Sequence, residues 1–150
     1  MENMTKTVLI IDDNPDFREA VIDILLDQEF DIYEAECPKA AFDILFNEVP
    51  DIILCDLNMP FTTEHDQKEF LSGNKVGIET IKELGWAFPD TPIICISAAS
   101  PWELVEAEKE LGHVKILRKP VSPKDLLTEI EQSFMPPFAK SVCGEEFIEH

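Results

Sequence analysis

The feature that most constrains the fold is a short apolar run, Ile52 to Cys55, which ends on Asp56 and lies between Pro50 and Pro60. An unbroken apolar run rich in β-branched side chains predicts a strand buried on both faces, as in the centre of a parallel sheet. In open α/β folds, functional groups gather where such strands end. Taken by itself, Asp56 is more simply explained as a solvated carboxylate at a strand end, so its role depends on what the other strands place beside it.

Similar apolar runs occur elsewhere in the chain, and a helical pattern follows each of them. The expected additional strands are 7–11, 31–35, 93–96 and 114–117, and the expected helices begin at Pro15, at Pro38, near Gly77, at Pro101 and at Pro123. We expect Gly85 to end the helix that begins near Gly77. Strands that alternate with helices predict an α/β fold, in which helices cover both faces of a parallel sheet.

The charge of the chain limits its partners. The sequence has 150 residues, enough for one domain, with 31 acidic against 12 basic side chains and a formal net charge of -19. Such a surface repels nucleic acids and anionic membranes, and it favours divalent cations and basic protein surfaces. No segment resembles a signal peptide or a membrane span, and the cysteines are scattered without metal-ligand spacing. We therefore expect a reduced, cytoplasmic protein.

Polar residues follow four of the expected strands. They are Asp12 and Asp13 after the first, Asp56 after the third, Ser97 after the fourth and Lys119 after the fifth. Right-handed crossovers bring the carboxyl ends of parallel strands to one edge, so we expect these side chains to meet. Viewed separately, the adjacent Asp residues are a helix-capping pair and Lys119 is a solvated cation. Viewed together, the carboxylates suit Mg²⁺, and the hydroxyl and the ammonium suit phosphoryl transfer.

Four motifs at these strand ends resemble the receiver domain of two-component response regulators. They are Val-Leu-Ile-Ile-Asp-Asp-Asn at 8–14, Asp-Ile-Ile-Leu-Cys-Asp-Leu-Asn-Met-Pro at 51–60, Ile-Ser-Ala at 96–98 and Lys-Pro at 119–120. Each motif is weak alone, but the four in this order are specific, and the resemblance covers roughly residues 5–135. It implies a flavodoxin-like, doubly wound (βα)5 fold with strand order 2-1-3-4-5.

The resemblance implies that Asp56 accepts a phosphoryl group from a histidine kinase, a phosphotransfer protein or a small phosphodonor. The reaction would depend on Mg²⁺, with Mn²⁺ as an alternative ion. The implied metal ligands are Asp12, Asp13, Asp56 and the backbone carbonyl of Asn58. Such a domain is a signalling phosphoprotein of a phosphorelay that acts through a downstream protein. It is not a turnover enzyme, although it catalyses its own phosphoryl transfer and slow autodephosphorylation.

The other matching residues also receive roles from the resemblance. Ser97, with Ala98 beside it, would hydrogen-bond a phosphoryl oxygen, and Lys119 would form an ion pair with Asp56 or its phosphoryl group. The bond between Lys119 and Pro120 would be cis, an isomer open mainly to bonds before proline. Homodimers of this family commonly form through the helix from Pro101, the fifth strand and the last helix.

Three departures from the family pattern stand out. The loop at about 61–76 is longer than usual, by about a dozen residues. It forms a lid, forms a specific contact with a kinase or another partner, or is a tolerated surface insertion. Ile116 occupies the position of the usual switch aromatic. The receiver domain is expected to span 1–135, and 136–150 to be a tail with no effector domain.

Two alternative functions remain open on the sequence. A receiver-like interaction module that works without phosphorylation fits the altered position at Ile116 and the long loop. A phosphatase of the haloacid-dehalogenase type also uses a nucleophilic Asp with Mg²⁺. That chemistry requires a second Asp two residues after the nucleophile, whereas position 58 is Asn.

Overall fold

The computed structural model describes residues 5–60, 75–112 and 114–135. Within these ranges, the strands are β1 (Thr7–Ile11), β2 (Asp31–Ala35), β3 (Ile52–Cys55), β4 (Ile93–Ser97) and β5 (Lys115–Arg118). They form one parallel sheet in the order β2-β1-β3-β4-β5. The predicted α/β class is confirmed, and so is the strand order that the resemblance implied.

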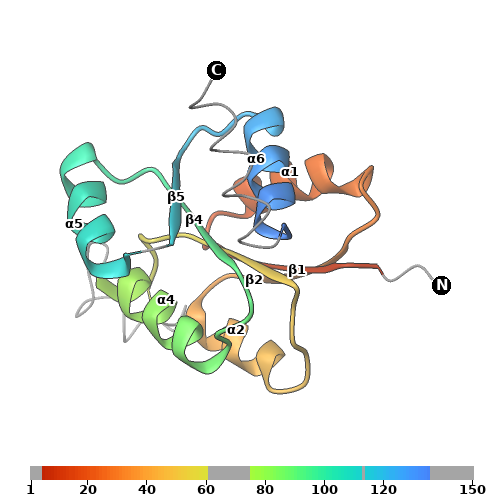
Figure 1. Ribbon diagram of the computed structural model, residues 1–150, viewed down its shortest axis with the longest axis horizontal. Coiled ribbons are helices and arrows are strands. Elements are labelled where there is room, and N and C mark those ends of the chain that lie inside the picture. The colour runs from red at the N-terminus through yellow and green to blue at the C-terminus, as the bar shows by residue number, and fades with distance from the viewer. Residues whose placement is uncertain (1–4, 61–74, 113, 136–150) are drawn as a thin grey trace.

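The helices cover both faces of this sheet. They are α1 (Pro15–Leu26), α2 (Pro38–Leu45), α4 (Lys75–Ala87), α5 (Pro101–Leu111) and α6 (Pro123–Ser133). Helices α1 and α6 lie on one face, and α2, α4 and α5 lie on the other (Figure 1). None of the described helices is long and apolar enough to cross a membrane.

Side chains of the central strands alternate between these two faces. In β1, Val8 and Ile10 join the apolar cluster beneath α1 and α6, whereas Leu9 and Ile11 join the cluster beneath α2, α4 and α5. Strand β3 alternates in the same way, and all its residues are at most 2% exposed. The predicted burial of this strand on both faces is therefore confirmed, and its first polar side chain comes where it leaves the sheet.

Three helices begin with the same local signal, a polar cap followed by proline. The Asn14 side chain accepts the N–H groups of Asp16 and Phe17 at the start of α1. Ser100 and Ser122 cap α5 and α6. Each capping oxygen accepts a hydrogen bond from a backbone N–H that has no partner inside the helix. Proline is tolerated at the first helical position because an N–H there has no partner inside the helix, so its absence removes no hydrogen bond. The caps fix where the chain turns back from the carboxyl edge of the sheet.

Gly85 does not end a helix, contrary to the prediction. Helix α4 continues through it to Ala87, and Pro89 follows shortly after. An internal glycine costs a helix about 1 kcal/mol relative to alanine, but Leu84 and Ile81 are buried on the sheet side and anchor this turn. Tertiary packing thus overrides the local end signal.

Four other boundaries differ by one or two residues. The fourth strand ends at Ser97, not at 96, and the fifth runs from Lys115 to Arg118, not from 114 to 117. Helix α4 starts at Lys75, inside the segment 61–76 that was predicted as a loop. The rest of that segment and the predicted 136–150 tail lie outside the described residues.

Gly77 allows α4 to approach the end of β3. A Cβ atom at this position would overlap the backbone carbonyl and Cα of Leu57, which itself is fully buried. The start of α4 therefore packs directly on the segment that follows Asp56. The close approach needs a residue without a side chain.

We expect Gly77→Ala to lower the free energy of unfolding by about 1–3 kcal/mol, the usual cost of forcing an extra methyl group into a packed core. Gly85→Ala is the matched control in the same helix, because a Cβ there meets nothing within 4 Å. That variant should gain about 0.5–1 kcal/mol, since alanine loses less conformational freedom in a helix. Urea unfolding of both variants measures the difference, and equal stabilities would contradict the close packing at Gly77.

Candidate functional site

Main-chain hydrogen bonds tie the strand ends together at the carboxyl edge of the sheet. The N–H of Asp56 donates to the carbonyl of Ile11, the last residue of β1, at 2.9 Å. On the other side, the N–H of Lys119 donates to the carbonyl of Ser97, the last residue of β4, at 2.8 Å. The side chains that follow these strands are thus held on a rigid frame.

Three of the predicted carboxylates meet at this edge. Asp12, Asp13 and Asp56 each offer an oxygen, and these oxygens all lie within 4.8 Å of one another. Asp13 is exposed, but Asp12 is only 2% exposed and Asp56 only 5%. The first interpretation of Asp56 as a solvated strand end is therefore wrong.

Lys119 reaches into this cluster from the end of β5. Its Nζ donates to Asp12 Oδ2 at 2.8 Å and lies 3.8 Å from Asp56 Oδ2. The other oxygen of Asp56 accepts the N–H of Leu57 at 2.8 Å. Asp56 thus has one oxygen fixed by the backbone and the other facing the ammonium, whose shortest contact is with Asp12.

Burial and like charge disturb the titration of the cluster. Burial, and then the neighbouring Asp12 carboxylate, raise the pKa of Asp56 from 3.8 to about 6, against the opposing effects of Lys119 and of the backbone N–H groups at positions 58 and 57. The pKa of Asp13 is raised for the same two reasons, burial first and Asp12 second. Crowded carboxylates of this kind either bind protons or recruit a cation.

The donor set fits Mg²⁺. The cluster offers oxygen ligands only, and Mg²⁺ prefers one or two carboxylates with the remaining positions filled by water. Asn58 adds a further observation, because its side-chain Oδ1 is buried and has no hydrogen-bond partner among the described residues. A buried acceptor without a partner costs about 1–3 kcal/mol. Asp12, Asp13 and Asp56 would hold the ion, and the unpaired acceptor lies on the segment that follows Asp56.

The remaining residues that the sequence predicted for the site differ in their burial and in their contacts. Ser97 is fully buried, and its Oγ accepts the N–H of Ala99 at 3.0 Å. In this conformation the hydroxyl therefore stabilises the turn that follows β4. Ala98 is exposed. The Lys119–Pro120 bond is cis. Ile116 is half-buried and packs against the apolar cluster beneath α2, α4 and α5.

Sequence reasoning missed Arg18 at this site. Its Nη1 donates to the backbone carbonyl of Asp12 at 2.7 Å, and its Nε pairs with Glu34 at 2.9 Å. Arg18 thereby fastens the end of β1 to β2, next to the carboxylates. It is the only basic residue between Lys6 and Lys39 and comes soon after the acidic pair, a signal that could have identified it.

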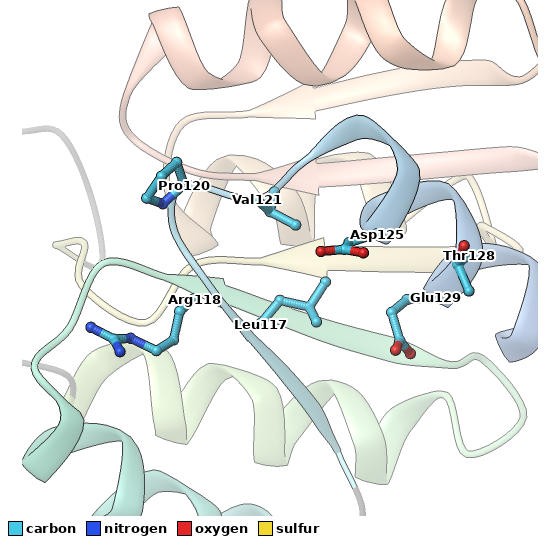
Figure 2. Close-up of a pocket in the computed structure, with 7 residues that line it drawn as sticks. All are labelled: Leu117, Arg118, Pro120, Val121, Asp125, Thr128 and Glu129. Carbon is cyan, nitrogen blue, oxygen red and sulfur yellow. The ribbon is translucent and has the colours of Figure 1, made fainter.

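A hollow of about 270 Å³ lies between the end of β5 and helix α6 (Figure 2). Arg118 comes from the strand, and Asp125 and Glu129 come from the helix. Glu129 also pairs with Lys115 at 3.4 Å. The residues that line the hollow do not include the acidic cluster or Lys119, so it is a separate feature of mixed charge.

A parallel (βα)5 sheet with buried carboxylates and a lysine at its carboxyl edge defines the receiver class of signalling domains. Comparison with protein-family models agrees, because residues 8–131 match the response regulator receiver domain. The chain belongs to this family and is a receiver domain of two-component response regulators.

Individual relatives are distant in sequence. The phosphate regulon transcriptional regulatory protein PhoB of Pseudomonas aeruginosa is 26% identical over 126 residues, which are 84% of this chain and 50% of PhoB. The chain thus spans about half the length of that relative. Sporulation initiation phosphotransferase F of Bacillus subtilis is 24% identical over 117 residues, 78% of this chain and 84% of that protein.

Solved structures show the same fold. The chemotaxis protein CheY4 of Vibrio cholerae is 23% identical, with a TM-score of 0.70 over 87% of this chain and 100% of that one. A CheY-like receiver domain protein of Methanospirillum hungatei is 21% identical, with a TM-score of 0.70 over 86% of this chain and 93% of that one.

In metal-free buffer, we expect Asp56→Asn to change the pH dependence of stability. The folded pKa of Asp56, about 6, exceeds its unfolded value of 3.8, so the folded state holds the proton more tightly and wild-type stability falls as pH rises between these values. At 1.36 kcal/mol per pKa unit, the variant should become more stable than wild type by about 3 kcal/mol above pH 6. Asp23→Asn, an exposed charge removal on α1, controls for net charge. Parallel pH profiles of wild type and Asp56→Asn in urea unfolding would contradict the raised pKa.

Mg²⁺ should stabilise the protein, because it relieves the repulsion among the carboxylates. At a hundredfold excess over its dissociation constant, the expected gain is about 2.7 kcal/mol if only the native state binds. Asp13→Asn should weaken this gain, and Asp23→Asn should keep it. Thermal unfolding with and without millimolar Mg²⁺ measures both, and a wild-type melting curve indifferent to the ion would argue against the metal site.

Proposed function

We propose that the chain accepts a phosphoryl group on Asp56 in a Mg²⁺-dependent reaction and passes the signal on through protein contacts. One observation carries this proposal. Asp56 is a buried carboxylate with Oδ1 fixed by the Leu57 N–H at 2.8 Å and Oδ2 facing the Lys119 ammonium at 3.8 Å. A carboxylate oriented in this way presents one oxygen as a nucleophile beside a ready counter-charge.

The chemistry follows from these contacts. An oxygen of Asp56 forms a bond to phosphorus while the bond to the donor's leaving atom breaks, and the leaving group departs with that electron pair. Lys119 then pairs with the new phosphoryl oxygens, and Ser97 turns its hydroxyl from the Ala99 N–H toward them. Mg²⁺, when bound at Asp12, Asp13 and Asp56, would neutralise charge on the transferring group.

The phosphoryl donor is, we propose, a histidine kinase or a phosphotransfer protein, and small phosphodonors can replace it. A cytoplasmic location accords with such a donor. Output through the surface of α5, β5 and α6 is supported by exposed apolar side chains on α5, where Trp102 is 73% and Val105 47% exposed. Exposed apolar groups of this size favour contact with a protein, including a second copy of the chain.

Two observations bear on the rival functions. At position 58, where the phosphatase chemistry needs an acid, the side chain is an Asn whose Oδ1 is buried and has no hydrogen-bond partner in the part of the chain that the structure describes. An interaction module without phosphorylation has no use for three carboxylates gathered within 4.8 Å at a cost in repulsion. Phosphoryl transfer explains both the carboxylates and the lysine.

Incubation with acetyl phosphate and Mg²⁺ should add one phosphoryl group to the wild-type protein, seen by intact-protein mass spectrometry at short times. Asp56→Asn should show no adduct. Asp51→Asn is a suitable control, because Asp51 precedes β3, at the opposite end of this strand from Asp56. Its carboxylate accepts the N–H of Thr7 at the start of β1. Absence of the adduct from wild type would refute the phosphoacceptor role. Sustained release of phosphate from phosphomonoesters would instead support the phosphatase.

A further inference from the structure

We infer that Phe17 is a positioning residue for phosphoryl transfer, because its ring holds the Lys119 ammonium over the acidic cluster. The Lys119 Nζ lies 4.1 Å from the centroid of the Phe17 ring. A cation within about 6 Å of a ring centroid, over its face, is attracted by the negative potential of that face. The inference rests on the proposed function, since it assigns one more residue to the same reaction.

The sequence fixes where the Phe17 ring lies. Pro15 opens α1, and the Asn14 side chain accepts the Phe17 N–H at 3.3 Å, so Phe17 belongs to the capped first turn. Helical side chains lean toward the N-terminus of their helix, which here is the carboxyl edge of the sheet. The half-buried ring also packs against the apolar cluster beneath α1 and α6. Core packing therefore holds one part of the ring while its face meets the ammonium.

An aromatic ring suits this place better than another charged side chain. Lys119 Nζ already contacts Asp12 at 2.8 Å and Asp56 at 3.8 Å. A further carboxylate would add to the repulsion among the three that are present. The ring attracts the cation without adding net charge, and the Lys119 side chain beside it is only 16% exposed, so little water reaches it. Exclusion of water strengthens the remaining charge interactions.

The contact matters at the moment of transfer. Before the reaction, the shortest contact of Lys119 is with Asp12, and afterwards its partner is the phosphoryl group on Asp56. The ammonium must exchange partners without turning outward into solvent. Phe17 borders it throughout this exchange, so loss of the ring face should slow phosphorylation by about two- to fivefold.

The experiment compares phosphorylation rates with acetyl phosphate at saturating Mg²⁺. Phe17→Leu keeps apolar bulk but removes the ring and should be about two- to fivefold slower than wild type. Phe17→Tyr keeps the ring and should restore the rate to within about twofold of wild type. Phe134→Leu is the matched control, because Lys6 lies over the Phe134 ring at 4.9 Å, in the other cation–π pair of the described residues. This control should keep the wild-type rate.

Two further measurements separate positioning from a structural role. In the metal-free protein, the ε-methylene protons of Lys119 should show an upfield ring-current shift by NMR, lost in Phe17→Leu and kept in Phe17→Tyr. In a Lys119→Met background, Phe17→Leu should slow the residual reaction no further.

The outcomes distinguish this inference from the proposed function. A wild type that takes up no phosphoryl group contradicts the proposed function. A wild type that is phosphorylated, with Phe17→Leu as fast as Phe134→Leu, overturns the role of Phe17 alone. An unshifted Lys119 signal in wild type overturns the contact itself, whatever the fold of the variants.

Discussion

Repulsion among three carboxylates at one sheet edge is the constraint on which the rest of this structure depends. Asp12, Asp13 and Asp56 offer oxygens within 4.8 Å of one another, and Asp12 and Asp56 are buried. Lys119 offsets part of this charge, and the N–H groups after Asp56 offset a little more. The pKa of Asp56 is still raised to about 6, by burial first and by the neighbouring Asp12 carboxylate second. The net negative charge of the three carboxylates attracts a divalent cation, and such an ion supports phosphoryl transfer.

The fold supplies the frame that keeps these groups from moving apart. Ile11 and Cys55 are paired neighbours at the ends of β1 and β3, so Asp12 and Asp56 leave the sheet side by side. Ser97 and Arg118 are paired in the same way, which places Lys119 just beyond the end of β4. Apolar clusters on both faces hold these registers. The strands therefore bring together residues that are far apart in the sequence.

Sequence patterns predicted this frame because burial on both faces leaves an unmistakable apolar run, as at β3. They also predicted which polar residues meet, because parallel topology determines where strands end. They did not predict that Asp56 is buried, since strand periodicity says nothing about what packs around the end of a strand. Gly85 was misjudged because the packing of α4 outweighed a local end signal. The contact of Phe17 with Lys119 could not be predicted either, because it depends on how α1 and the end of β5 lie in space.

The two side chains that would respond to phosphorylation, Lys119 and Ser97, already have hydrogen-bond partners inside the protein. Lys119 is bonded to Asp12, and the Ser97 hydroxyl accepts the N–H of Ala99. Transfer as proposed thus exchanges hydrogen bonds instead of creating them from free groups, so the change in free energy is smaller than the new contacts alone suggest. In the proposed reaction, the neighbouring strand pair for a signal from Ser97 would be β4 and β5, where Cys95 is paired in register with Ile116. Ile116 has no hydroxyl and packs against the apolar cluster beneath α2, α4 and α5, so any coupling from Ser97 through this position would act by packing.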